Sequence, residues 1–155
     1  YVYSGRRMSY PNPWLYQGEV FETEMIGDYY GFVYLLHNQS TEKFYVGKKF
    51  FWSSKILPVT KTRKRRKKTK VESDWKKYYG SNTKLKGEIE EKGIDIVSRN
   101  ILWLCNTKTQ CAYYELVEQV NRRVLLSDKY YNDFIGGKIT GRFLTEIKQN
   151  DQDLL

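Results

Sequence analysis

Two short apolar runs separated by a polar turn constrain the fold of this 155-residue chain more than any other feature. Residues 32–36 and residues 44–47 are rich in aromatic and β-branched side chains, which favour strands. Residues 38–41 between them (Asn, Gln, Ser, Thr) are typical of a turn. The pattern predicts a β-hairpin that starts at Gly31.

The register of this hairpin decides which side chains meet. With the turn at residues 38–41, Tyr34 stands directly opposite Tyr45, and directly opposed residues share a face of the sheet. Alternation along the second strand adds Gly47 and Lys49 to that face. We therefore expect one face of the hairpin to carry two phenols and an ammonium group.

A third strand and two helices are expected after the hairpin. Residues 101–104 are apolar and predict the strand, while Asn82 and Gly93 are typical of the two ends of a short helix. A longer helix is expected from about residue 109 to 124, because apolar side chains recur there at helical spacing. That stripe consists of Tyr113, Leu116, Val117, Val120 and Val124, beside a polar flank of Glu115, Gln119 and Arg122.

These elements predict a small α+β domain with a three-stranded, mainly antiparallel sheet flanked by helices. The domain is expected at residues 31–135, with a basic insertion at residues 59–72 and a C-terminal tail at residues 136–155. Residues 1–30 are rich in aromatic side chains and interrupted by Pro11 and Pro13. They predict an arm that either packs its aromatics on the domain or touches a partner.

Eight of the ten residues from 61 to 70 are Lys or Arg, in a chain with 27 Lys+Arg against 18 Asp+Glu. Like charges this dense repel one another and bury nothing, so a mobile loop is expected when no partner is bound. A solvated loop or an address signal is one interpretation, and contact with phosphates, which a positive excess favours, is the other. The cations are Lys61, Arg63, Lys64, Arg65, Arg66, Lys67, Lys68 and Lys70.

Composition excludes several chemistries. One histidine (His37) and two cysteines (Cys105 and Cys111) are too few for a four-ligand zinc site, and no motif for Ser-His or Cys-His catalysis accompanies them. The sequence has neither a run of about 18 apolar residues nor a secretory leader pattern, so a cytoplasmic protein with reduced thiols and no membrane contact is expected. Proton abstraction is left to tyrosine, lysine or a metal-bound water.

Four features in order resemble the GIY-YIG nuclease family. The letters GFVY at residues 31–34 and YVG at residues 45–47 are similar to the paired GIY and YIG motifs. Glu115 on the amphipathic helix and Asn132 in the Tyr-Asn pair match the family's helical glutamate and later asparagine. The resemblance covers about residues 31–132.

The resemblance implies hydrolysis of DNA phosphodiester bonds with Mg²⁺ or Mn²⁺. Tyr34 or Tyr45 would help to deprotonate the attacking water, and Glu115 would hold one divalent ion, which polarises the phosphate and stabilises the leaving oxygen. Asn132 would support the geometry of the site. Gly47 would allow the close approach of strand or substrate. Lys48 next to it is expected to contact the DNA, which is duplex or branched.

The family's usual arginine has no direct counterpart here. It ordinarily follows the second motif by one or two helical turns, and Lys55 stands near that distance. Lys49, on the tyrosine face, is the first candidate for the cation that neutralises developing charge. The alternatives are Arg63, Arg65 and Arg66, with Tyr78 or Tyr79 as the accompanying aromatic residue. Arg99 is left as either an ion-pair partner or a phosphate contact.

Two rival functions stay open. A catalytically silent nucleic-acid-binding module with the same fold is favoured by the missing arginine and disfavoured by Glu115. An RNA-binding protein without nuclease ancestry requires all four matches to be accidental. The segment at residues 75–81 is similar to GIY-YIG proteins encoded by phages. It implies a nuclease of a phage, a mobile element such as a homing endonuclease gene, or a restriction system, acting as monomer or homodimer in a bacterial cytoplasm.

Overall fold

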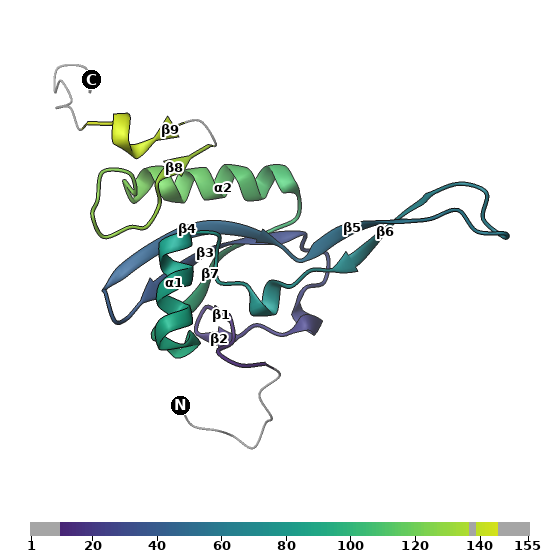
Figure 1. Cartoon of the computed structure of the whole chain (residues 1–155), viewed down its shortest axis with the longest axis horizontal. Coiled ribbons are helices and arrows are strands. Elements are labelled where there is room, and N and C mark those ends of the chain that lie inside the picture. Colours follow the sequence, from purple (N-terminus) through teal and green to yellow (C-terminus); the bar gives the residue numbers. More distant parts are fainter. Residues whose placement is uncertain (1–9, 137–138, 146–155) are drawn as a thin grey trace.

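A five-stranded mixed sheet forms the centre of the computed structural model, which describes residues 10–136 and 139–145 (Figure 1). Its strand order is β2-β1-β7-β3-β4, so β4 lies at one edge. The strands are β1 (Leu15–Tyr16), β2 (Glu19–Val20), β3 (Gly31–Asn38), β4 (Lys43–Phe50) and β7 (Val97–Cys105). β3 is antiparallel to both of its neighbours, whereas β1 pairs parallel to β7. The predicted α+β class is confirmed, with a larger sheet than the expected three strands.

Helices cover both faces of this sheet. The helix α1 (Thr83–Lys92) places Leu85 in the same buried cluster as Tyr34, and α2 (Lys108–Asn121) places Cys111 in the cluster of Val33 and Val46 on the other face. Short 3-10 turns complete the chain: η1 (Thr23–Met25), η2 (Trp75–Lys77), η3 (Ile94–Ile96) and η4 (Gly141–Phe143). Within the described residues, no helix combines the length and the apolar character that crossing a membrane requires.

The ends of α1 follow the predicted signals. The Asn82 side chain accepts a hydrogen bond from the Leu85 N–H at 3.0 Å, and Gly93, with φ of 93°, ends the helix. A left-handed φ at this position is a conformation that glycine adopts without steric cost.

The helix α2 turns a polar side toward the sheet. An apolar stripe ordinarily faces the core, but Tyr113 and Val120 are 60% and 54% exposed. Buried Gln119 instead donates from Nε2 to the Val46 carbonyl at 3.2 Å. Cys111 and Tyr114 on the same helix pack in the cluster of Val33 and Val46, so the buried side of α2 combines apolar contacts with this hydrogen bond. The helix ends at Asn121, three residues before the expected end.

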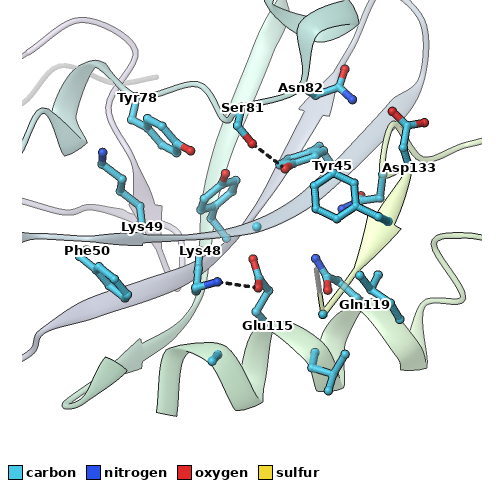
Figure 2. Close-up of a pocket in the computed structure, with 18 of the residues that line it drawn as sticks. Tyr45, Lys48, Lys49, Phe50, Tyr78, Ser81, Asn82, Glu115, Gln119 and Asp133 are labelled. Atoms are coloured by element: carbon cyan, nitrogen blue, oxygen red, sulfur yellow. Dashed lines mark hydrogen bonds and ion pairs between the residues drawn. The ribbon is translucent and has the colours of Figure 1, made fainter. Parts of the chain in front are cut away.

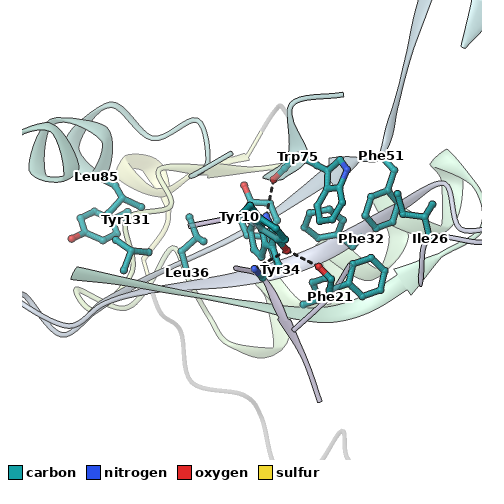
Figure 3. Close-up of a cluster of buried hydrophobic side chains, with 13 residues drawn as sticks. Tyr10, Phe21, Ile26, Phe32, Tyr34, Leu36, Phe51, Trp75, Leu85 and Tyr131 are labelled. Atoms are coloured by element: carbon teal, nitrogen blue, oxygen red, sulfur yellow. Dashed lines mark hydrogen bonds between the residues drawn. The ribbon is translucent and has the colours of Figure 1, made fainter. Parts of the chain in front are cut away.

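The N-terminal segment packs its aromatics into the core, which confirms one of its two interpretations for residues 10–30 (Figure 3). Tyr10 donates to the Phe21 carbonyl at 2.7 Å, and Trp14 Nε1 donates to the Trp75 carbonyl at 2.7 Å. β1 and β2 also come from this segment. The first nine residues of the expected arm lie outside the described residues, as do residues 137–138 and 146–155 of the expected tail.

The β3–β4 hairpin has a different register from the expected one. Tyr34 pairs with Gly47 and not with Tyr45, and Asn38 pairs with Lys43, so the turn lies at residues 39–42. The Asn38 side chain accepts hydrogen bonds from the Ser40 N–H at 2.9 Å and its hydroxyl at 2.7 Å, which starts the turn one residue later than expected. A displacement of two residues keeps the alternation, so the predicted shared face of the two tyrosines is confirmed.

Residues 67–70 of the basic run belong to a paired strand where a loop was expected, while residues 61–66 lie outside the strands. β5 (Trp52–Leu57) and β6 (Lys67–Glu72) form a two-stranded antiparallel ribbon that projects from the domain (Figure 1). We call residues 52–72 the basic arm; it begins seven residues before the expected insertion. Backbone pairing needs no burial of side chains, so the charges stay exposed while the ladder forms. The short strands β8 (Phe134–Ile135) and β9 (Ile139–Thr140) form a third sheet.

Candidate active site

A pocket of about 930 Å³ opens along the outer edge of β4 (Figure 2). Residues 129–132 cover the first half of this edge, because the Phe44 N–H donates to the Lys129 carbonyl at 2.8 Å and the Tyr131 N–H donates to the Phe44 carbonyl at 2.8 Å. The pocket begins where this pairing stops, beside Gly47. Side chains from both faces of the sheet reach it there.

Asn132 forms the last rung of that pairing. Its Oδ1 accepts from the Val46 N–H at 3.1 Å, and its Nδ2 donates to the Val46 carbonyl at 2.8 Å. The amide therefore replaces a strand residue on the edge of β4, and it is buried. Asn132 therefore holds the backbone of β4 next to the pocket.

Tyr34 reaches the pocket by passing over Gly47. A Cβ on Gly47 would lie 2.4 Å from the Tyr34 hydroxyl and 2.7 Å from its ring, closer than any side chain tolerates. Tyr34 is 1% exposed and packs edge-on against Tyr78 at a centroid distance of 6.0 Å. Only a residue without a side chain fits opposite this phenol.

The two motif tyrosines differ in their surroundings. Their rings lie 6.2 Å apart, and the Tyr45 hydroxyl is 3.1 Å from the Ser81 hydroxyl. Burial, reinforced by the neighbouring Tyr78 and Tyr45, raises the pKa of Tyr34 well above 10.0. Burial also raises the pKa of Tyr45, but the Ser81 hydrogen bond acts against it. Tyr45 therefore releases its proton more readily than Tyr34.

Glu115 enters the pocket from α2 and meets Lys48. The Lys48 Nζ lies 3.0 Å from the Glu115 Oε1, and the Glu115 side chain is 18% exposed (Figure 2). One helical turn later, Gln119 also lines the pocket. Its Oε1 is buried and accepts no hydrogen bond from the described residues. The helix α2 thus gives the pocket a carboxylate and an amide oxygen, and β4 gives it the ammonium group of Lys48.

Lys49 lies on the tyrosine face, as alternation predicts. Its Nζ is 2.7 Å from the Asp74 carboxylate and 4.2 Å from the centre of the Tyr78 ring. The Lys49 hydrogen bond lowers the pKa of Asp74. Of the two aromatic candidates, Tyr78 lines the pocket, whereas Tyr79 stacks on Arg99.

Arg99 forms no ion pair with any residue that the structure describes, and at 1% exposure it is too deeply buried to contact a phosphate. Its buried guanidinium donates to the Tyr78 carbonyl at 2.9 Å and from Nε to the Asn12 carbonyl at 3.0 Å. It also lies over the rings of Trp14 and Tyr79. Arg99 therefore ties the N-terminal segment to the loop that carries Tyr78.

The structure brings together seven of the predicted site residues, while the basic run lies apart on the arm. The seven that line the pocket are Tyr34, Tyr45, Gly47, Lys48, Lys49, Glu115 and Asn132. Sequence reasoning did not assign Ser81, Asp133 or Gln119 to the site. For Gln119 a signal existed, because it follows Glu115 by four residues on one helix and so shares its face.

A family model described as "Putative endonuclease segE, GIY-YIG domain" matches residues 14–135. The match includes residues 14–30, which the sequence patterns had placed in a separate arm. Comparisons with curated proteins and with solved structures give no match.

Proposed function

The chain belongs to the GIY-YIG endonuclease family, and from this premise we propose that it hydrolyses DNA phosphodiester bonds in the β4 pocket with the help of a divalent metal ion. The observation that carries the proposal is that Tyr34 of β3, Tyr45 of β4, Glu115 of α2 and Asn132 of the segment between α2 and β8 meet in one pocket. A site on a sheet edge admits a polymer that continues beyond the pocket at both ends.

The pocket suits an ion that takes few protein ligands. The described residues contain no group of three His, Cys, Asp or Glu side chains close enough to hold a metal. Mg²⁺ prefers oxygen ligands and ordinarily keeps several waters, so one carboxylate is sufficient. Glu115 would hold Mg²⁺ or Mn²⁺, and Gln119 Oε1 is a second oxygen acceptor one turn away. When bound, the ion would polarise the phosphate and stabilise the leaving 3′-oxygen.

We assign proton uptake to Tyr45. In the reaction Tyr45 first releases its own proton to solvent, and its phenolate then takes the proton of the attacking water. The water oxygen bonds to phosphorus, the bond from phosphorus to the 3′-oxygen breaks, and the leaving 3′-oxygen takes up a proton from solvent. Tyr34 stays protonated at a pH at which Tyr45 ionises, because burial raises the pKa of Tyr34 well above 10.0. Tyr45 opens to the pocket and has Ser81 as hydrogen-bond partner, so it is the better acceptor. Tyr34 acts as a neutral donor that orients the phosphate.

Lys49 takes the place of the family arginine in this proposal. Its ammonium group is held over the Tyr78 ring and against Asp74, so its position is restricted before substrate binds. A fixed cation beside the scissile phosphate neutralises charge that develops in the transition state. Asn132 keeps β4 in place. A role in a phage or mobile element, in a bacterial cytoplasm, stays a prediction. The number of subunits and the preference for duplex or branched DNA also stay predictions.

Cleavage of labelled DNA with Mg²⁺, Mn²⁺ or EDTA tests the proposal. Tyr45→Phe and Glu115→Gln should each lower the cleavage rate by about a hundredfold or more, because each removes one catalytic group. Tyr113→Phe and Glu91→Gln are matched controls on exposed positions and should cleave like the wild type. DNA affinity in a gel shift should persist in all four variants.

Two results would contradict the proposal. Cleavage in EDTA would exclude a requirement for a divalent metal ion. Failure to cut duplex, branched or single-stranded DNA with any divalent ion, while binding persists, would favour the catalytically silent binding module.

A further inference from the structure

Nearly all of the net charge of the chain lies on the basic arm. Nine of its residues are Lys or Arg and one is Glu, which gives a net charge of +8, while the whole chain carries +9. The rest of the chain has 18 Lys+Arg against 17 Asp+Glu and is almost neutral. The attraction of the protein for a polyanion is therefore concentrated on the basic arm.

The base of the arm is fixed to the rim of the pocket. Trp52, Ser53 and Ser73 line the pocket. The Ser73 hydroxyl donates to the Phe50 carbonyl at 2.6 Å, and the Ser73 N–H donates to the carbonyl of fully buried Phe51 at 2.8 Å. Because β5 begins and β6 ends next to anchored residues, the arm projects from the domain in a defined direction (Figure 1).

The tip of the arm is closed by a tight turn. The Thr60 N–H donates to the Arg63 carbonyl at 2.8 Å, and the Arg63 N–H donates to the Thr60 carbonyl at 3.2 Å. The Arg63 side chain folds back and donates to the Pro58 carbonyl at 2.6 Å. The six residues of β5 span roughly 20 Å at about 3.3 Å per residue, and residues 58–60 extend the arm to the turn, which gives roughly 30 Å at most.

Cations occupy both faces of the ribbon. Ser54 pairs with Lys70 and Ile56 with Lys68, which places these lysines on the face of Trp52. The pairs of Lys55 with Thr69 and of Leu57 with Lys67 belong to the opposite face. A ribbon made to lie flat on one phosphate backbone would need cations on a single face.

We propose that the basic arm lies in the major groove of duplex DNA and extends along the flank on one side of the scissile phosphate. The major groove is about 12 Å wide, admits a two-stranded ribbon, and places a phosphate backbone on each side of it. The length of the arm is close to one turn of the duplex, about 34 Å. A duplex flank of about one turn, on one side of the cut, is then part of the substrate. The inference rests on the proposed function, which puts the scissile phosphate in the pocket.

Binding measurements test the arm without any cleavage. DNA binding is measured in EDTA for two triple variants. K61S/K64S/K68S removes three lysines of the arm, and K86S/K92S/K129S removes three exposed lysines elsewhere. For a duplex of about 30 base pairs, the slope of log K against log[salt] should become less steep by about 2 to 3 in the arm variant, since each lost phosphate contact contributes about 0.9. The control variant should keep the wild-type slope, and single-stranded DNA should distinguish the two variants much less.

Mapping the cuts near duplex ends tests the direction of the arm. With Mg²⁺ and end-labelled duplexes, the wild type should avoid sites within about ten base pairs of the end on one side only. The arm variant should lose this asymmetry. Three results would each overturn the proposal. The arm and control variants could have equal salt slopes, the arm substitutions could weaken binding to single-stranded DNA as much as binding to duplex, or the wild type could avoid both duplex ends equally. A weakened salt slope together with no cleavage anywhere would refute the nuclease and leave the arm as a duplex-binding element.

Discussion

The hydroxyl of Tyr34 lies directly over Gly47, so close that a single added methyl group would stand 2.4 Å from it. The two residues are cross-strand partners in the β3–β4 ladder. The tyrosine of the first family motif therefore depends on the glycine of the second for its place in the pocket. The two motifs form one packing unit.

Gly47→Ala should destabilise the fold by about 1–3 kcal/mol, the usual cost of overpacking a buried site. Tyr34 must move to admit the methyl group, so cleavage should also be lost. Urea unfolding gives the free energy of unfolding. Gly87→Ala is the matched control, because Gly87 lies in α1 with open space around it; it should stabilise by about 0.5–1 kcal/mol. Equal stabilities of Gly47→Ala and the wild type would refute the packing account.

Asn132→Ala should lower the free energy of unfolding by about 1–3 kcal/mol, because it leaves the N–H of buried Val46 without its partner. The Val46 carbonyl keeps Gln119 as a donor. Hydrogen exchange of the Val46 amide should become faster, and Asn121→Ala, at an exposed position at the end of α2, should leave it unchanged. An unchanged exchange rate in Asn132→Ala would show that the side chain does not hold the edge of β4.

Stability should fall as pH rises above about 10. Burial raises the pKa of Tyr10 to about 12, although the Trp14 N–H bond acts against it. Between 10 and 12 the unfolded chain releases a proton that the folded chain keeps. The stabilisation is therefore present below pH 10 and lost across this window, at about 1.4 kcal/mol per pH unit. In urea unfolding at pH 9–12, the free energy of unfolding should fall less steeply with pH for Tyr10→Phe than for the exposed control Tyr113→Phe.

Ser81→Ala should shift the pH dependence of cleavage. The Ser81 hydrogen bond holds down the pKa of Tyr45, so its removal raises that pKa further. If the Tyr45 phenolate takes up the proton, the pH of half-maximal rate should move to higher values while the plateau rate changes less. Ser98→Ala, on β7, serves as the control. A plateau that falls with no shift in the profile would assign Ser81 a structural role.

Lys48→Met should strengthen metal binding at Glu115. Lys48 neutralises this carboxylate at 3.0 Å, and a metal ion must compete with it. Removal of a partly exposed ion pair changes affinities by up to about 1 kcal/mol, or about fivefold. Calorimetric titration of Mn²⁺ without DNA measures the effect apart from catalysis. Arg122→Met, which breaks the Glu118 pair on the same helix, should leave the Mn²⁺ affinity unchanged; a weaker affinity in Lys48→Met would contradict the competition.

The sequence by itself determined the features that depend on local spacing. Alternation with a period of two predicts that Tyr34, Tyr45 and Lys49 share one face of the hairpin. This prediction is correct although Tyr34 pairs with Gly47 and not with Tyr45, because a shift of two residues leaves the alternation unchanged. Helical periodicity located α2, and Asn82 and Gly93 marked the ends of α1, because capping is a local property of the chain.

Only the tertiary structure decided which groups meet across long separations. Amphipathic periodicity predicts that the stripe with Tyr113 and Val120 faces the core, but the structure buries the side that carries Gln119. The Gln119 side chain joins Asn132 as a donor to the Val46 carbonyl. The two-residue strands β1 and β2 are too short to show a period. Residues 67–70 of the basic run became part of a strand because β5 supplied partners for their backbone, a pairing that side-chain charge does not reveal. The site itself formed because Asn132 bonds to an edge strand 86 residues earlier, and an edge has unpaired groups only once the sheet exists.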